Sequence, residues 1–251
     1  MKRLGVFASG RGSNFKAIVH HEKLHVLENV HVGLLITNDS NAPAIIVAEQ
    51  NSIPHVNIEG TWRRGFRSKE ERERAREKFD KTAHEVLGQH SIDLVVLAGF
   101  MQVLGPEMIR AYPQAVMNIH PATDLARFGG PGMFGDRVHA AVLKAGVKES
   151  GCTVHYADES VDGGPIILQT PVQVEVADTP ESLAKRILVQ EHRTYSKAIQ
   201  LHVDGRISVQ GRRAVIDYSG GWEEQWARRQ AAFVRCQDEE MRNKEQLLHP
   251  A

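Results

Sequence analysis

An amide and an imidazole stand two residues apart at Asn118 and His120, and Pro121 follows directly. If this segment is a strand, the alternation of side chains places Asn118 and His120 on one face and Ile119 toward the core. An amide donor beside an imidazole at the end of a strand is suited to stabilise the oxyanion of a tetrahedral intermediate. The pattern therefore indicates chemistry on a carbonyl group, against the alternative of a histidine that is only structural.

A second polar position is Asp162, which is followed by Gly163, Gly164 and Pro165. The two glycines allow a close approach of backbone or ligand. An aspartate near an imidazole would favour the charged form of that imidazole. The alternative is a turn without catalytic function, for which these residue types are equally suited. We expect Asp162 to join Asn118 and His120 in one catalytic cluster.

A third candidate site is the glycine-rich turn at residues 10–14, which follows an apolar stretch and opens a helical one. Free amides at the start of a helix attract anions. The turn departs from a dinucleotide fingerprint because Phe15 occupies the third small position and no acidic residue ends the next strand before Asp39. It fits one phosphate, bound by the amides of Gly12 and Ser13 and by the Asn14 side chain, or else a purely structural turn.

Short apolar stretches that alternate with helical ones must position these residues. The pattern predicts an α/β fold of the Rossmann-like kind, with a mostly parallel twisted sheet, helices on both faces and a helical extension at the carboxyl end. We expect strands at residues 4–8, 30–37, 53–58, 94–99, 117–120, 153–156, 166–169 and 214–218. We expect helices at residues 15–21, 42–50, 138–145 and 179–201, with a glycine-rich irregular loop at residues 121–137.

The chain divides by composition into a catalytic domain over residues 1–210 and an extension over residues 211–251. From Trp222 to about Leu248 the extension is rich in Glu, Arg and Gln, which predicts an amphipathic helix. This helix is expected to pack on the domain or on a second copy of the chain. A homodimer therefore stays open.

Overall composition argues against several classes of protein. The 251 residues contain 31 Lys and Arg against 31 Asp and Glu, so no strong field favours nucleic acid or a membrane surface. Two cysteines are too few for a disulfide framework, and the histidines lack the spacing of a metal site. The apolar run at the amino end is too short for a signal peptide. We expect a cytoplasmic enzyme.

A charged segment at residues 68–78 mixes both signs at helical spacing, which predicts a solvated helix. Upstream of it, Arg63, Arg64 and Arg67 have fewer acidic neighbours. Whether these three arginines bind a carboxylate or a phosphate is left open by the pattern.

Six segments together resemble the folate-dependent formyltransferases, and within them the phosphoribosylglycinamide formyltransferases of purine synthesis. They are residues 9–14, 97–101, 118–121, 151–155, 162–166 and 190–192. The likeness extends over roughly residues 2–209. The Asn-x-His-Pro and Asp-Gly-Gly-Pro motifs mark the whole group, and the Gly-Ser-Asn turn narrows the choice to the glycinamide ribonucleotide branch.

The resemblance implies a role for each matching residue. Asn118, His120 and Asp162 match the catalytic residues, with 10-formyltetrahydrofolate as the formyl donor and glycinamide ribonucleotide as the acceptor. Asn118 would donate to the oxyanion, and His120, kept protonated by Asp162, would supply charge and a proton. The substrate phosphate would be held by Gly12, Ser13 and Asn14, and the ribose hydroxyls by Glu191. The implied folate contacts are Arg76, Met101, Gln102, Val103, Leu104, Ala157, Asp158, Glu159, Ser160 and Val161.

The chain also departs from the family pattern. After Pro121 the family has a Leu-Leu-Pro type of segment, whereas this chain has a longer, altered loop over residues 122–135. Gln102 stands where many members have arginine. The alternatives that remain are a formyltetrahydrofolate hydrolase or another folate-dependent formyltransferase. A nucleotide-binding module or a regulatory protein without catalysis is an alternative of another class.

Overall fold

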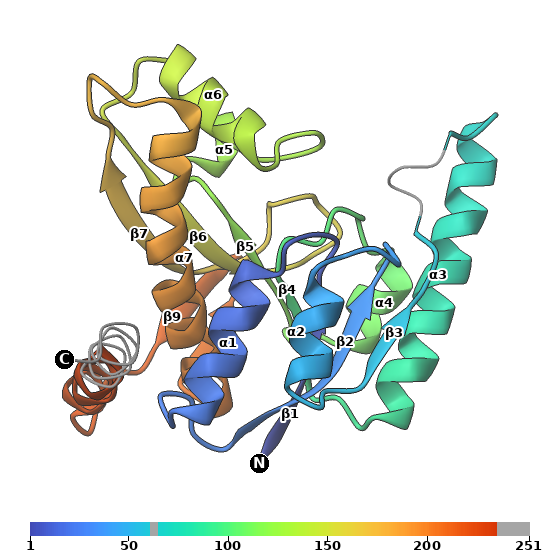
Figure 1. Cartoon of the computed structure of the whole chain (residues 1–251), viewed down its shortest axis with the longest axis horizontal. Coiled ribbons are helices and arrows are strands. Elements are labelled where there is room, and N and C mark those ends of the chain that lie inside the picture. Colours follow the sequence, from blue (N-terminus) through green and yellow to red (C-terminus); the bar gives the residue numbers. More distant parts are fainter. Residues whose placement is uncertain (61–64, 235–251) are drawn as a thin grey trace, which may run out of the picture.

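A computed structural model describes residues 1–60 and 65–234 of the chain, and a mixed β-sheet runs through its middle (Figure 1). Within those residues the sheet has nine strands in the order β3-β2-β1-β4-β5-β6-β7-β9-β8. The strands are β1 (Lys2–Phe7), β2 (Val30–Thr37), β3 (His55–Asn57), β4 (Leu94–Leu97), β5 (Val116–His120), β6 (Glu149–Tyr156), β7 (Ile166–Gln173), β8 (Ile207–Gln210) and β9 (Arg213–Ile216). The helices are α1 (Ser13–Lys23), α2 (Ala44–Gln50), α3 (Lys69–Gln89), α4 (Pro106–Ala111), α5 (Leu125–Phe128), α6 (Asp136–Lys144) and α7 (Pro180–Val203).

The first five strands are parallel, and their order reverses next to β1. This strand pairs with β2 on one side and with β4 on the other, because the chain returns from β3 to begin β4 beside β1. Strand β6 then runs antiparallel to both of its neighbours, β5 and β7, whereas β7 pairs with β9 in parallel. The predicted α/β fold with a mostly parallel sheet is confirmed. In such sheets, ligands bind outside the carboxyl ends of the strands at the point of reversal.

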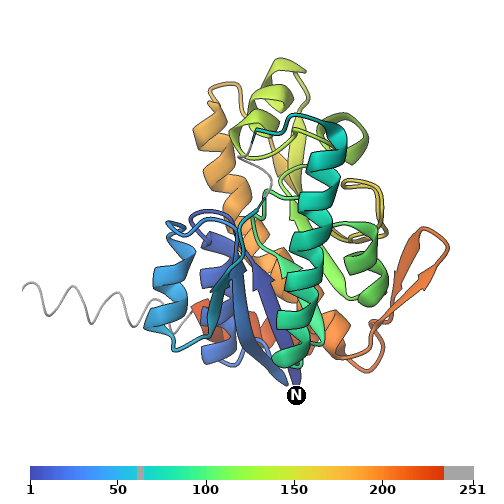
Figure 2. The ribbon, with the colours of Figure 1, turned by 90° about the vertical axis from the view of Figure 1, so that its right-hand side faces the viewer.

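Helices cover both faces of the sheet (Figures 1 and 2). One hydrophobic cluster joins the sheet to α1, α2 and α7 through side chains such as Ile18, Ala48 and Ile187. A second cluster joins the other face to α3 and α4 through Phe79 and Met108. Alternate residues of β4 belong to the two clusters, as expected for a central strand that is buried on both faces.

Two long helices begin at residues whose side chains cap the first turn. The hydroxyl of Ser68 accepts a hydrogen bond from the Glu71 amide at the start of α3, so the charged segment is helical as predicted. Thr179 and Ser182 form a reciprocal capping box at the start of α7, with Pro180 in the first turn. These local signals account for the correct prediction of both helix starts.

The glycine-rich segment after β5 is more ordered than predicted. Instead of an irregular loop over residues 121–137, it contains the short helix α5 and the first turn of α6. The Asp124 carboxylate accepts a hydrogen bond from the Arg127 amide and so caps α5. One capped turn among glycines is too short for a periodic pattern to reveal. Helix α4 and strand β8 were not predicted either.

The carboxyl-terminal part of the described chain packs on its own domain. Strands β8 and β9 form an antiparallel hairpin that crosses the predicted boundary at residues 210 and 211, so a separate unit beginning at 211 stays a prediction. Residues 222–234 are helical, and Trp222 and Trp226 stack with ring centroids 5.7 Å apart. Arg229 pairs with Glu28 at 2.7 Å. The predicted helix is confirmed as far as residue 234, and the rest of it lies outside the described residues.

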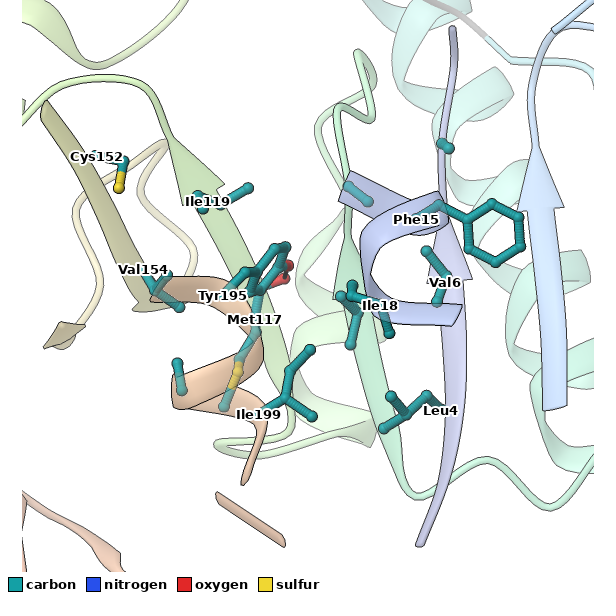
Figure 3. Packing of buried hydrophobic residues seen from close by; sticks show 14 of the residues in the cluster. Leu4, Val6, Phe15, Ile18, Met117, Ile119, Cys152, Val154, Tyr195 and Ile199 are labelled. Atoms are coloured by element: carbon teal, nitrogen blue, oxygen red, sulfur yellow. Dashed lines mark hydrogen bonds between the residues drawn. The ribbon is translucent and has the colours of Figure 1, made fainter. Parts of the chain in front are cut away.

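Tyr195 of α7 ties the carboxyl ends of two central strands together. Its hydroxyl lies 2.9 Å from the carbonyl oxygen of Met117 on β5 and 3.1 Å from that of Leu97 on β4. The side chain is fully buried among the apolar residues of the first cluster (Figure 3). Because Asn118 follows Met117, this buried hydroxyl holds the strand end that carries the candidate catalytic residues.

We expect Tyr195→Phe to lower the free energy of unfolding by about 1–3 kcal/mol, because two buried carbonyl groups lose their shared donor. Urea unfolding followed by circular dichroism measures this change. Tyr218→Phe is the matched control, since the Tyr218 side chain is 39% exposed and should change stability by less than about 0.5 kcal/mol. Equal losses for the two variants would contradict the role given to the Tyr195 hydroxyl.

Candidate active site

The three predicted catalytic residues meet at one edge of the sheet. Asn118 and His120 lie at the carboxyl end of β5, which is next to β4 and close to the reversal of strand order. Asp162 comes from the loop between β6 and β7. Residues 44 positions apart are thus brought together by the antiparallel pairing of β5, β6 and β7.

The Asp162 carboxylate is the common partner in this cluster. Its Oδ1 accepts a hydrogen bond of 3.1 Å from the Asn118 side-chain amide. Its Oδ2 lies 3.4 Å from His120 Nδ1 and accepts a bond of 3.0 Å from the Gly130 amide. The His120 and Asp162 side chains are 4% and 10% exposed. A carboxylate so deeply buried needs these partners to remain ionised.

The backbone of the Asp162 loop is adapted to this position. Asp162 has a φ of 56°, a left-handed conformation that is uncommon for residues other than glycine. A Cβ atom at Gly164 would lie 1.9 Å from the carbonyl oxygen of Tyr156. Glycine is therefore required at Gly164, which explains part of the Asp-Gly-Gly-Pro pattern in physical terms.

Burial and charge act against each other in this cluster. Burial opposes ionisation of Asp162, but His155, His120 and the Gly130 amide outweigh it and hold the pKa of the carboxyl group below its ordinary value. Burial lowers the pKa of His120 below its ordinary 6.5, although Asp162 and the Phe128 carbonyl act in the opposite direction. Asp162 is therefore ionised at neutral pH. Its negative charge favours protonation of His120, as predicted. Burial has the larger effect in the free protein, so the pKa of His120 stays below 6.5.

The altered loop after Pro121 contacts the catalytic residues directly. His120 Nε2 lies 2.7 Å from the carbonyl oxygen of Phe128, so this nitrogen carries a hydrogen and donates it. The same loop supplies the Gly130 amide that binds Asp162. Although its sequence departs from the family pattern, the loop fixes both the ring orientation of His120 and one oxygen of Asp162.

His155 is a fourth polar side chain in the cluster, and the sequence reasoning did not select it as catalytic. It lies directly opposite Asn118 in the pairing of β5 with β6. Its Nε2 is 3.3 Å from the Asn118 Nδ2 and 3.6 Å from the Asp162 Oδ1. The segment at residues 151–155 belongs to the family resemblance, but only the register between β5 and β6 places His155 in the site.

The glycine-rich turn leads into α1 as predicted. Gly12 is the N-cap residue in a left-handed conformation with φ 67°, and no side chain caps the helix. The amides of the first turn are thus left available for an anion. The Asn14 side-chain amide donates a 2.7 Å hydrogen bond to Glu191. One hydrogen of this amide is thus used by Glu191, and the expected contact of Asn14 with a phosphate stays a prediction.

Of the two segments expected to contact folate, residues 101–104 follow the carboxyl end of β4, whereas residues 157–161 begin beside the start of β5, where the Ala157 amide donates to the Val116 carbonyl. The Met101 amide donates to the Ser9 hydroxyl at 2.8 Å, next to the phosphate turn. Leu104 and Ala157 both pack in the second hydrophobic cluster. Arg76 of α3 approaches the same segment, with Nε 3.5 Å from where a Cβ of Gly105 would lie. The other expected contacts occur within these two segments: Gln102, Val103, Asp158, Glu159, Ser160 and Val161.

The remaining predictions concern charge, metals and membranes. Arg63 and Arg64 lie outside the described residues; Arg67 is exposed, and its role as a ligand contact stays a prediction. Residues 1–60 and 65–234 contain no group of three or more His, Cys, Asp or Glu side chains placed to hold a metal ion. In the same part of the chain, none of the helices has the length and apolar character needed to span a membrane.

Comparison with known proteins gives one consistent family. The chain matches the formyl transferase family over residues 2–199. It is 37% identical over 206 residues to the chloroplastic phosphoribosylglycinamide formyltransferase of Arabidopsis thaliana, which covers 82% of this chain and 67% of the relative. The phosphoribosylglycinamide formyltransferase of Bacillus subtilis is 36% identical over 80% of this chain and 94% of its own length. The solved structure of glycinamide ribonucleotide transformylase 1 from Symbiobacterium toebii superposes with a TM-score of 0.75 at 35% identity, over 86% of this chain and 94% of that one. With the sheet order, the Asn118–His120–Asp162 cluster and these matches in agreement, the chain belongs to the formyl transferase family.

Proposed function

We propose that this protein transfers the formyl group of 10-formyltetrahydrofolate to the amine of glycinamide ribonucleotide, a step of purine biosynthesis. The observation that carries the proposal is the shared Asp162 carboxylate, which contacts Asn118 and His120 at the edge where ligands bind. The phosphate-binding type of turn at Gly12 lies near the same edge. The names of the relatives agree with this assignment.

The chemistry follows from the residue types. The substrate amine attacks the formyl carbon, a new carbon–nitrogen bond forms, and the carbonyl oxygen becomes an oxyanion. Asn118 Nδ2 has two hydrogens; one binds Asp162, and the other must leave His155 Nε2, 3.3 Å away, to bind the oxyanion. The intermediate collapses when the bond to the folate nitrogen breaks. Asp162, acting through a water molecule, helps to move the amine proton to that nitrogen.

His120 acts in this scheme through Nε2, the ring nitrogen that faces away from Asp162. In the free protein, Nε2 donates a hydrogen bond to the Phe128 carbonyl. When the substrate is bound, Nε2 must donate this hydrogen bond to the substrate oxygen instead. An oxyanion beside Nε2 raises the pKa of the imidazole. The proton on His120 is therefore favoured during the reaction, and Asp162 reinforces it from the other side of the ring.

The proposal includes binding roles, which the same geometry supports. The amides of Gly12 and Ser13 bind the substrate phosphate, and the Glu191 carboxylate accepts hydrogen bonds from the ribose hydroxyls. Asn14 orients Glu191 through its 2.7 Å hydrogen bond. The folate lies against residues 101–104 and 157–161, with Arg76 near its glutamate tail.

Hydrolysis of 10-formyltetrahydrofolate uses the same catalytic groups with water in place of the amine, so the acceptor must be tested directly. The assay follows folate absorbance with 10-formyltetrahydrofolate, in the presence and absence of glycinamide ribonucleotide. Turnover only with the ribonucleotide supports the proposal. Turnover without any acceptor identifies a hydrolase, and no turnover in either case refutes both assignments.

We further propose that the enzyme acts in the cytoplasm and assembles as a homodimer. The balanced charge of the chain is compatible with an aqueous compartment. Light scattering after size-exclusion chromatography tests the assembly. A mass of 28.0 kDa at working concentrations would exclude the dimer.

Asn118→Ala and His120→Ala are each expected to lower kcat by about 10²–10³, the usual cost of one lost oxyanion donor. Neither change should unfold the protein, which thermal denaturation checks. His55→Ala and Asn57→Ala are matched controls because both side chains are exposed on β3, and both variants should retain full turnover. Near-wild-type turnover of either catalytic variant would refute the assignment.

Asp162→Asn is expected to lower the pKa of His120 further below 6.5, because the negative charge that opposes burial is removed. A proton NMR titration of the imidazole resonances, assigned with His120→Gln, measures the shift. The substitution should also lower kcat. An unchanged or raised pKa in the variant would show that Asp162 does not stabilise the charged imidazole.

Gly12→Ala is expected to raise KM for glycinamide ribonucleotide and to lower stability. The new Cβ would lie 2.7 Å from the Ala44 Cβ at a φ of 67°, so the turn must shift away from its phosphate-binding geometry. Gly10→Ala is the control, since a Cβ at Gly10 has no neighbour within 4 Å. Equal KM values for the two variants would argue against a binding role for the turn.

A further inference from the structure

The hairpin formed by β8 and β9 joins the main sheet beside the loop that carries Asp162. Among the described residues, β9 pairs with the sheet at one position, Arg213 with Ile166. Ile166 follows the Asp-Gly-Gly-Pro segment directly. The tip of the hairpin, at Gly211 and Arg212, therefore lies next to the end of the catalytic loop; Figure 2 shows the hairpin extending from the body of the domain.

Arg212 makes a side-chain contact with this loop. Its guanidinium Nη2 donates a hydrogen bond to the carbonyl oxygen of Gly163, the residue after Asp162. Arginine is charged at all relevant pH values, which strengthens its bonds to carbonyl oxygens. The bond fixes the peptide plane between Gly163 and Gly164.

The loop needs such a constraint because of its composition. Asp162 is in a left-handed conformation, and the two glycines after it have wide conformational freedom. Without an external contact, the peptide planes at Gly163 could rotate and move the Asp162 carboxylate away from Asn118 and His120. A displacement of about 1 Å at a catalytic group can lower a rate severely.

The base of the hairpin is anchored, so its tip has a defined position. Arg206 bonds to Asp217 at 3.1 Å and to the Ser219 carbonyl at 3.0 Å. The Arg206 amide bonds to the Leu201 carbonyl at the end of α7. Side chains along both strands pack on the first hydrophobic cluster, for example Ile207. The hairpin is thus bonded to the end of α7 at its base and to the Gly163 carbonyl at its tip, so the position of α7 restricts the position of that carbonyl.

We propose that Arg212 is a positioning residue for Asp162, acting from the hairpin of β8 and β9 through the Gly163 carbonyl. This inference rests on the proposed formyl transfer. Arg212 does not touch the reacting groups. Its contribution is to keep the Asp162 loop in the arrangement that orients the carboxylate toward His120.

The test compares Arg212→Ala and Arg212→Lys with Arg213→Ala, whose exposed side chain lies one position further along the hairpin. For Arg212→Ala we expect kcat to fall about fivefold to tenfold, as for the loss of one hydrogen bond. KM for glycinamide ribonucleotide should stay within about twofold, because the phosphate turn is untouched. Arg212→Lys should recover at least half of the lost rate, since an ammonium group also donates to a carbonyl. Arg213→Ala should match the wild type.

The NMR titration of His120 gives a second readout that does not need turnover. In Arg212→Ala the imidazole should titrate at lower pH than in the wild type, because the Asp162 carboxylate moves away, and Arg213→Ala should leave it unchanged. Wild-type kcat and wild-type titration in Arg212→Ala would overturn the inference. So would equal losses in the alanine variants of Arg212 and Arg213. An inactive wild type with a shifted titration in Arg212→Ala would overturn the proposed function alone.

Discussion

The buried carboxylate of Asp162 is the group on which the arrangement of the catalytic edge depends. A carboxylate removed from water is costly unless polar partners surround it. Here the partners come from three parts of the chain: Asn118 and His120 on β5, the amide of Gly130, and His155 on β6. Because Asp162 binds the backbone amide of Gly130, the loop after β5 can change its sequence as long as a backbone N–H remains at residue 130. The altered residues 122–135 satisfy that condition.

Helix α7 connects strand β5, which carries Asn118 and His120, with the glycine-rich turn at residues 10–14. Glu191 and Tyr195 are four residues apart, so they lie on the same face of the helix. Glu191 bonds to Asn14 in the turn, whereas Tyr195 bonds to the ends of β4 and β5. One helical face therefore sets the position of the turn at residues 10–14 relative to the ends of β4 and β5. The reversal of strand order beside β1 brings the turn and these strand ends to the same edge of the sheet.

The arrangement around Asp162 also depends on the altered loop after β5 and on the hairpin after α7. The Phe128 carbonyl orients the ring of His120, and the hairpin after α7 reaches the loop of Asp162. Both segments contribute through backbone groups or through a contact to a backbone group. Backbone groups are present whatever the side chain is. The altered loop can therefore support the same catalytic residues as the family although its sequence differs.

The sequence by itself determined eight of the nine described strands, the starts of α3 and α7, and the residue types of the site, because apolar periodicity, helix-forming patterns and the motifs at Asn118, His120 and Asp162 are local. It did not reveal His155, the bond from Asn14 to Glu191, or the short helix α5. His155 faces Asn118 only through the register of β5 against β6, and Asn14 meets Glu191 across 177 positions of the chain. Pairing register and long-range side-chain contacts result from the packing of the whole sheet, so only the tertiary structure decided them.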